Sequence, residues 1–174
     1  MPRLLGRFGR PYRYVAECAS TQRLIASGDP EGAVAVADHQ TEGRGRLGRV
    51  WLDEPGAALL FSLSLRPSLP AARWPELTPL VGQAAAEAIA GVAGAEPEIK
   101  PPNDLLLGGL KVAGILAEAS ERQIVLGIGV NVSGAPATEA ATSLAEQTQR
   151  DIDRADLLVA LLDRIEHAYD AWRA

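Results

Sequence analysis

The sequence predicts an α+β protein in which helices flank a mixed, mainly antiparallel β-sheet. Most of its candidate strands are joined by short turns, which favours hairpins and antiparallel pairing. Its two long helical segments lie between strands or after them, instead of alternating with them one by one. The 174 residues contain no internal repeat, linker or low-complexity segment, so we expect a single domain over residues 1–174.

The first third of the chain is predicted to form short strands and one short helix. Residues 12–19 form a candidate strand, and Ser20 is a predicted N-cap because its hydroxyl can accept a hydrogen bond from the first helical turn. The helix covers residues 21–27 and ends at Gly28, since glycine accepts the left-handed conformation that closes many helices. Two apolar strands follow, at residues 33–37 and 57–65.

Two long helices are predicted from proline placement and apolar spacing. Pro75 suits the first turn of an Ala-rich helix that continues to Val92, with Gly94 just beyond its end. A brief strand at residues 98–100 is stopped by two prolines. Asp156 opens the last helix, whose apolar side chains recur at helical spacing: Leu157, Leu158, Leu161, Leu162, Ile165 and Tyr169.

The dipeptide Gly108-Gly109 predicts a hairpin turn within residues 104–116. Pairing across this turn places Asp104 and Lys111 diagonally on one face of the sheet, ~7–8 Å apart. Two interpretations remain open. The ammonium and the carboxylate could form a site that holds a metal ion, or they could form an ordinary cross-strand ion pair worth less than ~1 kcal/mol.

The segment 123–132 alternates cleanly and should pair with residues 111–119 through the turn at 120–122. One face points into a core, with Ile124, Leu126, Ile128, Val130 and Val132. The other face carries Gln123, Val125, Gly127, Gly129 and Asn131. Its two glycines leave a bare patch of sheet that either a flat ligand or a packed helix could cover. The Asn131 amide can both donate and accept hydrogen bonds, which suits an adenine or ureido edge. After this strand, a small-residue loop is expected over residues 133–139.

The segment Gly43–Trp51 interleaves three glycines with three arginines. Glycine lets a backbone pass close to a ligand, and arginine offers a planar fork of donors for phosphate or carboxylate oxygens. One interpretation is therefore a flexible cationic loop that folds over an anion. The other is a solvated turn or an RNA-contacting arm.

The composition limits the possible partners and compartment. The net charge of −5 creates no overall field toward nucleic acid or anionic lipid. Cys18 is the single cysteine, so no internal disulfide is possible, which fits a reducing cytoplasm. No apolar run approaches the ~20 residues that span a bilayer, and no signal-peptide core is present. Of the 17 basic residues, only Lys100 and Lys111 are lysines. One interpretation is that these two positions need the compact point charge of an ammonium instead of a guanidinium fork, and the other is chance.

Six segments, in this order, resemble the motifs of the biotin protein ligase family. They are Ser20-Thr21-Gln22, residues 37–51, Lys100–Asp104, Lys111–Leu116, Gly127–Asn131 and Thr142-Ser143-Leu144. The resemblance extends from about residue 14 to residue 172. It implies the sheet architecture that biotin synthetases share with class II aminoacyl-tRNA synthetases.

The resemblance also implies a two-step reaction. Biotin and ATP, with Mg²⁺, would give biotinyl-5′-AMP and pyrophosphate. A lysine of the biotin carboxyl carrier protein of a biotin-dependent carboxylase would then take the biotinyl group, and the ligase could act as a homodimer. Two alternatives stay open: a lipoate or octanoate ligase of the same fold, and a non-catalytic biotin-binding remnant. The Gly43–Trp51 motif and Gln40 favour biotin.

Motif positions imply the site residues. Lys111 and Arg46 would be catalytic, with Lys111 touching the biotin carboxylate and the bridging phosphate oxygens. The implied biotin-binding residues are Ser20, Thr21, Gln22, Gln40, Arg44, Gly45, Arg46, Lys111, Gly114, Leu116, Gly127 and Gly129. The implied ATP-binding or phosphate-binding residues are Arg49, Trp51, Asn103, Asp104 and Asn131, with Asp104 also the expected Mg²⁺ ligand. For Trp51, a buried anchor for the loop is an equally open role.

Three features depart from the family pattern. Pro101 stands where the family usually has tryptophan in Lys-Trp-Pro-Asn-Asp, so the packing of that ring is missing. The N-terminus has no room for the winged helix of DNA-binding relatives, so we expect no DNA binding. The sequence stops just after the last predicted helix, where relatives usually continue into an SH3-like barrel. We therefore expect nucleotide affinity and biotinyl transfer to be the steps most affected.

Overall fold

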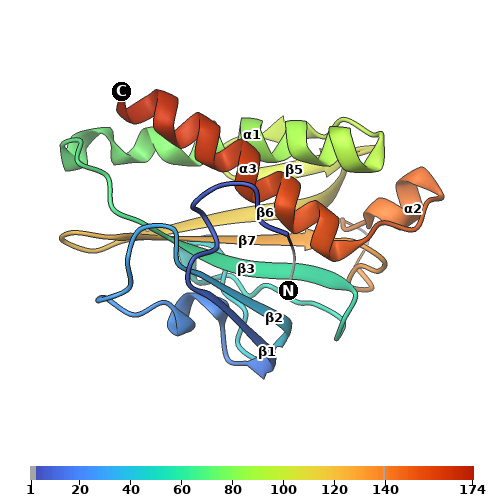
Figure 1. Cartoon of the computed structure of the whole chain (residues 1–174). Helices are drawn as coiled ribbons and strands as arrows, with labels where there is room; N and C mark the ends of the chain where they lie inside the picture. Colours follow the sequence, from blue (N-terminus) through green and yellow to red (C-terminus); the bar gives the residue numbers. More distant parts are fainter. Residues whose placement is uncertain (1–2, 139) are drawn as a thin grey trace.

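Seven strands form one sheet in the order β1-β2-β3-β7-β6-β5-β4 (Figure 1). The computed structural model describes residues 3–138 and 140–174. Only β1 and β2 run parallel, and every other neighbouring pair is antiparallel, which confirms the predicted mixed, mainly antiparallel sheet. The strands are β1 Tyr12–Cys18, β2 Val34–Gln40, β3 Ala58–Leu65, β4 Glu98–Lys100, β5 Asp104–Leu107, β6 Leu110–Ala119 and β7 Ile124–Asn131.

Two long helices lie side by side across one face of this sheet (Figure 1). They are α1 (Leu77–Ala93) and α3 (Arg154–Arg173), and a short helix α2 (Leu144–Thr148) precedes α3. The hydrophobic core fills the space between helices and sheet, and it contains the whole predicted apolar face of residues 124–132. Because side chains alternate along a strand, the glycine-bearing face of β7 turns away from these helices.

The first helix is shorter than the sequence predicts. It is one 3₁₀ turn, η1 (Thr21–Leu24), in which the predicted N-cap Ser20 accepts a hydrogen bond from the Gln22 amide. The expected continuation to residue 27 is wrong because the Ala26 amide donates to the Asp29 carboxylate, 2.8 Å away, instead of to a helical carbonyl. This competition ends the helix and keeps the side chains of η1 at the end of the sheet.

The boundaries of the long helices follow their caps. A 3₁₀ segment η3 (Ala71–Glu76) contains Pro75, so α1 begins two residues later than predicted, and Gly94 closes it with a φ of 74°. The last helix begins before Asp156, because the carboxylate of Asp153 accepts from the amides of Ala155 and Asp156 at 2.7 and 2.9 Å.

The Gly-Gly hairpin forms as predicted, with one change of register. Gly108 and Gly109 both have positive φ, 57° and 78°, as a type I′ turn requires. Lys111 faces Leu106, as expected. A bulge between Leu105 and Leu106 then shifts the pairing, so Asp104 lies opposite Gly114.

The N-terminal segment is tied to α3 by charge. The guanidinium of Arg7 lies 2.8 Å from Glu166 and 2.6 Å from Asp170, and its hydrogen bond to Asp170 holds the pKa of that carboxyl below its usual range. On α3, burial and a hydrogen bond to Glu31 raise the pKa of Tyr169. These contacts fix the end of the chain against the helical layer.

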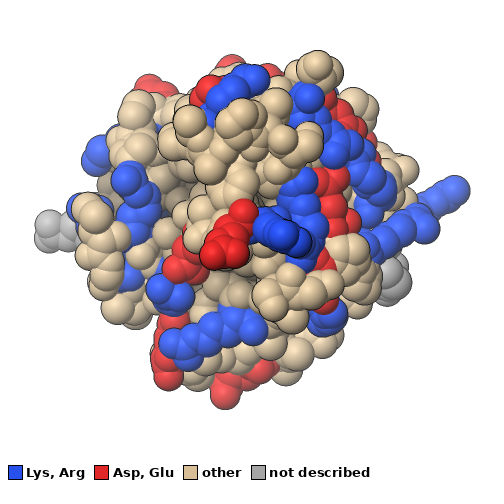
Figure 2. Space-filling model, turned by 90° about the vertical axis from the view of Figure 1, so that its left-hand side faces the viewer, with Lys and Arg blue, Asp and Glu red and all other residues tan. Residues whose placement is uncertain are grey.

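Charges of both signs are mixed on the side of the molecule that Figure 2 shows. Basic and acidic side chains are interleaved over this side, in line with pairs such as Arg23–Glu42 at 2.7 Å.

No helix in the described part of the chain has the length and apolar character needed to cross a bilayer. Residues 133–138 form the predicted loop, and Glu139, its expected last residue, lies outside the described residues.

The α3 cap gives a direct stability test. Asp153→Ala should lower the free energy of unfolding by about 1 kcal/mol, because two helical amides lose their acceptor. Asp151→Ala, on the same exposed approach to α3, is the matched control and should stay within about 0.5 kcal/mol of the parent chain. Chemical denaturation measures both. Equal losses in the two variants would contradict the assigned cap.

Candidate functional site

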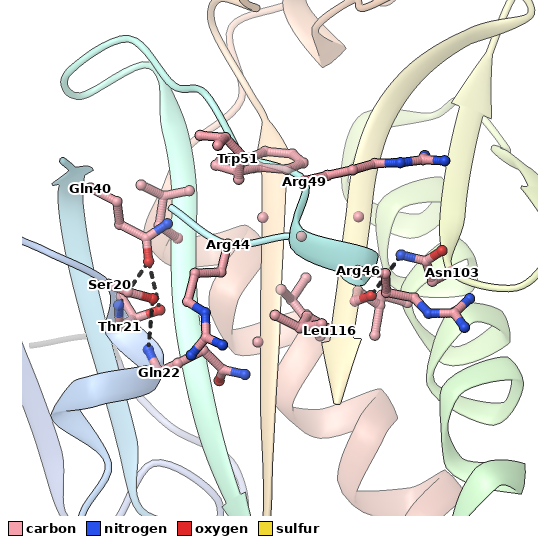
Figure 3. Close-up of a pocket in the computed structure, with 18 of the residues that line it drawn as sticks. Ser20, Thr21, Gln22, Gln40, Arg44, Arg46, Arg49, Trp51, Asn103 and Leu116 are labelled. Atoms are coloured by element: carbon pink, nitrogen blue, oxygen red, sulfur yellow. Dashed lines mark hydrogen bonds between the residues drawn. The ribbon is translucent and has the colours of Figure 1, made fainter. Parts of the chain in front are cut away.

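A cavity opens on the sheet face opposite α1 and α3. The empty space inside it is about 710 Å³, a figure that includes open solvent at its mouth. Figure 3 shows its walls: η1 and the end of β2 on one side, the Gly43–Trp51 segment across the top, and the β5–β6 region on the other side. Strands β6 and β7 form the floor.

The cavity brings together the site residues that the sequence predicted, with one exception. The predicted residues that line it are Ser20, Thr21, Gln22, Gln40, Arg44, Gly45, Arg46, Arg49, Trp51, Asn103, Asp104, Lys111, Gly114, Leu116, Gly127 and Gly129. Four apolar lining residues were not predicted: Val50, Leu60, Ile115 and Ile128. The exception is Asn131, which does not line the cavity.

Asn131 is buried at the end of β7, 2% exposed. Its Nδ2 donates to the carbonyl of Thr142 at 3.0 Å, and its Oδ1 is buried without a partner among the described atoms. The sequence missed this arrangement because the turn at Thr142 and the helix α2 behind it were not predicted. The expected contact of Asn131 with adenine therefore stays a prediction.

Hydrogen bonds fix the polar end of the cavity. The Oε1 atom of Gln40 accepts from the backbone amide and hydroxyl of Thr21, at 2.7 and 3.1 Å. The Thr21 hydroxyl is also 2.8 Å from the buried Ser62 hydroxyl. Because Oε1 is used in this way, the Nε2 of Gln40 is left as a donor. Gln40 reaches the site because β2 extends three residues beyond its predicted end at Ala37.

The Gly43–Trp51 segment is a structured hairpin. Arg44 and Val50 form an antiparallel bridge, the Gly45 amide donates to the Arg49 carbonyl at 2.8 Å, and the Trp51 amide donates to the Gly43 carbonyl at 3.0 Å. A side chain at Gly43 would place its Cβ 2.4 Å from the Trp51 carbonyl oxygen, so glycine is required there. Glycine in this segment therefore allows the two strands of the hairpin to lie close together over the cavity.

The indole of Trp51 covers the glycine patch on the floor. A Cβ at Gly129 would lie 2.7 Å from Trp51 Cζ2, and one at Gly114 would lie 3.2 Å from Cζ3. The Nζ of Lys111 lies 5.5 Å from the indole ring centroid, within cation–π range. The Nε1 of Trp51 is buried without a partner among the described residues. The sequence left open a ligand or a helix above these glycines, and the structure places the chain's own indole there.

The basic residues divide between the two ends of the cavity (Figure 3). Arg44 lies toward Gln22 and pairs with Glu118 at 2.8 Å. Arg46 lies beside Asn103 at the other end, and Arg49 extends toward that end from above. Within the described ranges, neither Arg46 nor Arg49 has a carboxylate partner, so both guanidinium groups remain available to an anion.

The β5–β6 wall carries the predicted ammonium–carboxylate pair. The Nζ of Lys111 lies 2.8 Å from Asp104 Oδ1, which confirms that the two groups share one surface. At this distance Asp104 Oδ1 is held directly against the Lys111 ammonium. Asn103 is fixed beside them by donating from Nδ2 to the Ile115 carbonyl at 3.0 Å. The amide oxygen of Asn103 and the Asp104 carboxylate are the oxygen donors of this wall.

Comparisons with known proteins define the class. The sequence model of the Biotin/lipoate A/B protein ligase family matches residues 16–134, and the chain belongs to this family. It is 40% identical over 166 residues to the bifunctional ligase/repressor BirA of Bacillus subtilis, covering 87% of this chain and 51% of that protein. It is 37% identical over 170 residues to the biotin–[acetyl-CoA-carboxylase] ligase of Mycobacterium tuberculosis, covering 91% of this chain and 64% of that protein.

A solved structure gives the same result for the fold. The biotin protein ligase of Aquifex aeolicus, in complex with biotin and ATP, superposes with a TM-score of 0.84 at 35% identity. The match covers 92% of this chain and 70% of that one. The chain thus spans about half the length of the Bacillus subtilis relative and a larger share of the Aquifex aeolicus ligase.

The glycine floor can be tested without any ligand. Gly129→Ala should displace the Trp51 indole, because the added methyl group would otherwise lie 2.7 Å from the ring. Tryptophan emission should shift to longer wavelength and acrylamide quenching should rise. Gly91→Ala, in α1 with open space around it, is the matched control. An unchanged tryptophan environment in Gly129→Ala would contradict the placement of the indole on Gly129.

Proposed function

We propose that this chain is the catalytic domain of a biotin protein ligase. It activates biotin with ATP to biotinyl-5′-AMP and transfers the biotinyl group to a lysine of a biotin carboxyl carrier protein. The observation that carries this proposal is a cavity with hydrogen-bonding side chains at one end and, at the other, two arginines that have no carboxylate partner within the described residues. The biotin and ATP complex of the Aquifex aeolicus relative supports the same substrates.

The polar end of the cavity suits the biotin ureido group. A ureido group needs donors for its carbonyl and acceptors for its two N–H groups. Gln40 offers Nε2 as a donor, and Gln22 offers a buried Oε1 that has no partner among the described atoms. The apolar lining from Leu60 and Leu116 suits the ring and valeryl chain.

Binding of biotin requires a change at Trp51. The indole lies directly on Gly114 and Gly129, so a bicyclic ring that packs on these two glycines would take the place of the indole. The indole belongs to the same hairpin as Arg44 and Arg46, so moving it also moves the basic residues. Ligand binding and hairpin rearrangement are therefore coupled in this proposal.

The other end of the cavity suits the triphosphate. Mg²⁺ prefers oxygen ligands and usually binds through one or two carboxylates plus substrate phosphates. Asp104 has a carboxylate, whose Oδ1 pairs with Lys111, and Asn103 has an amide oxygen beside it, so oxygen donors of the kind that Mg²⁺ prefers are present at this end. When bound, Mg²⁺ would neutralise phosphate charge. The described residues contain no cluster of three metal-ligating side chains, so we propose that the metal arrives with the nucleotide.

The proposed reaction has two steps. A carboxylate oxygen of biotin attacks the α-phosphorus of ATP, a new P–O bond forms, and pyrophosphate leaves. The ammonium of Lys111 and the guanidinium groups of Arg46 and Arg49 stabilise the charge that develops on the phosphate oxygens. The carrier lysine then attacks the acyl carbonyl as a free amine, an amide bond forms, and AMP leaves. The hairpin over the cavity excludes water, which would otherwise hydrolyse the mixed anhydride.

A lipoate or octanoate ligase is the second candidate, because the matched family includes such enzymes. A dithiolane or alkyl chain offers no hydrogen-bonding counterpart to the Gln22 Oε1 and the Gln40 Nε2. Burying these groups against an apolar substrate would leave them unpaired, at a cost of about 1–3 kcal/mol each. The polar end therefore favours biotin.

The proposal is tested by incubating the protein with biotin and [α-³²P]ATP. A labelled biotinyl-5′-AMP supports it, and label that appears only with lipoate or octanoate supports the second candidate. Biotin binding without any adenylate would identify a non-catalytic remnant. Adding a purified carrier domain then tests the transfer step, with incorporation of biotin followed by mass spectrometry.

Lys111→Arg gives a specific test of the proposed mechanism. The rate of adenylate formation should fall at least about tenfold, because the planar guanidinium cannot place a compact charge where the ammonium lies. Since Lys111 pairs with Asp104, thermal unfolding of the variant should be measured alongside. A stable variant with the parent rate would remove Lys111 from the mechanism.

A further inference from the structure

Glu118 lies near the end of β6 and does not line the cavity, yet it holds two side chains that do. Its Oε1 atom pairs with Arg44 Nη2 at 2.8 Å. Its Oε2 atom accepts from Gln22 Nε2 at 3.0 Å and from Arg44 Nη1 at 3.4 Å. One carboxylate thus joins η1, the Gly43–Trp51 hairpin and the sheet.

The contact with Gln22 determines which of its amide atoms is left without a hydrogen-bond partner. The Nε2 of Gln22 also donates to the Val125 carbonyl at 3.3 Å, so both of its acceptors lie on β6 and β7. The Oε1 atom is left buried, without a partner among the described atoms. It lies 3.1 Å from where a Cβ on Gly127 would be. A carboxylate can only accept, so Glu118 stabilises this orientation over the flipped one.

The contact with Arg44 fixes the hairpin to the sheet. Arg44 bridges to Val50, and the next hairpin residue is Trp51, whose indole rests on the glycine floor. The two other arginines of the hairpin, Arg46 and Arg49, have no carboxylate partner within the described ranges. Glu118 is therefore the ionic attachment point of the hairpin near the polar end.

The position of Glu118 makes this attachment stronger than an ordinary surface pair. A single exposed ion pair contributes little. Here the carboxylate is about one-third exposed, accepts from two different segments, and uses both oxygens. Loss of the charge would weaken both contacts at once.

We propose that Glu118 is a positioning residue that keeps the hairpin closed over the cavity and sets the Gln22 amide to accept a hydrogen bond from the ligand. The closing role concerns this chain by itself. The role toward the ligand rests on the proposed function, with the biotin ureido N–H as the donor. Glu118 holds the two walls that meet the substrate and takes no part in the chemistry.

The closing role is tested by limited trypsin digestion of the unliganded protein. Glu118→Gln should speed cleavage after Arg44, Arg46 or Arg49 by about threefold to tenfold, since the hairpin opens more often. The substitution leaves every trypsin site in place. Glu121→Gln, in the neighbouring exposed turn, makes the same change of charge and is the matched control. Equal cleavage rates for parent, variant and control, at equal melting temperatures, would overturn the closing role.

The ligand role is tested by biotin binding and by initial rates. Glu118→Gln should raise the dissociation rate of biotin about fivefold and raise KM for biotin while changing kcat less than twofold. Glu118→Asp keeps the charge and should restore part of the affinity. An unchanged dissociation rate would overturn the ligand role. If digestion responds but neither parent nor variant binds biotin, the closing role stands and the proposed function fails.

Discussion

The site depends on the absence of side chains on one face of β6 and β7. Gly114, Gly127 and Gly129 leave backbone exposed where any larger residue would project into the cavity. This permits the amide of Gln22 and the indole of Trp51 to approach the sheet closely. On the opposite face of the same strands, apolar side chains pack under α1 and α3. One pair of strands thus supplies both a rigid foundation and an open floor, which favours a precise site on a stable element.

Charge is distributed to match a ligand with one neutral polar end and one anionic end. Arg44 is engaged by Glu118, whereas Arg46 and Arg49 remain available at the end near Asn103. Lys111 lies on the β5–β6 wall, close to both the indole ring and the Asp104 carboxylate. The arrangement gives an acidic protein a local group of basic side chains that an anionic ligand could meet.

Much of this could be predicted from the sequence, because periodicity and turn chemistry are local. The Gly108-Gly109 turn predicted that Asp104 and Lys111 share one face of the sheet. The alternation of residues along β7 predicted which of its faces packs in the core and which carries the glycines. The bulge before Leu106, the indole on the floor and the Glu118 contacts could not be predicted. Each depends on segments far apart in the chain meeting in space. The true cap of α3 was missed because Asp153 and Asp156 are equally good caps by composition.

The central claim is that one cavity holds biotin and nucleotide together, with the acyl–phosphate link beside Lys111. A crystal structure of the protein with bound biotinyl-5′-AMP tests it most directly. The account predicts the bicyclic ring near Gln22 and Gln40, the indole of Trp51 moved off Gly129, and Lys111 Nζ within hydrogen-bond distance of the phosphate. It would be contradicted by a ligand bound elsewhere on the surface, or by one bound here while Lys111 stays with Asp104 and touches no phosphate oxygen.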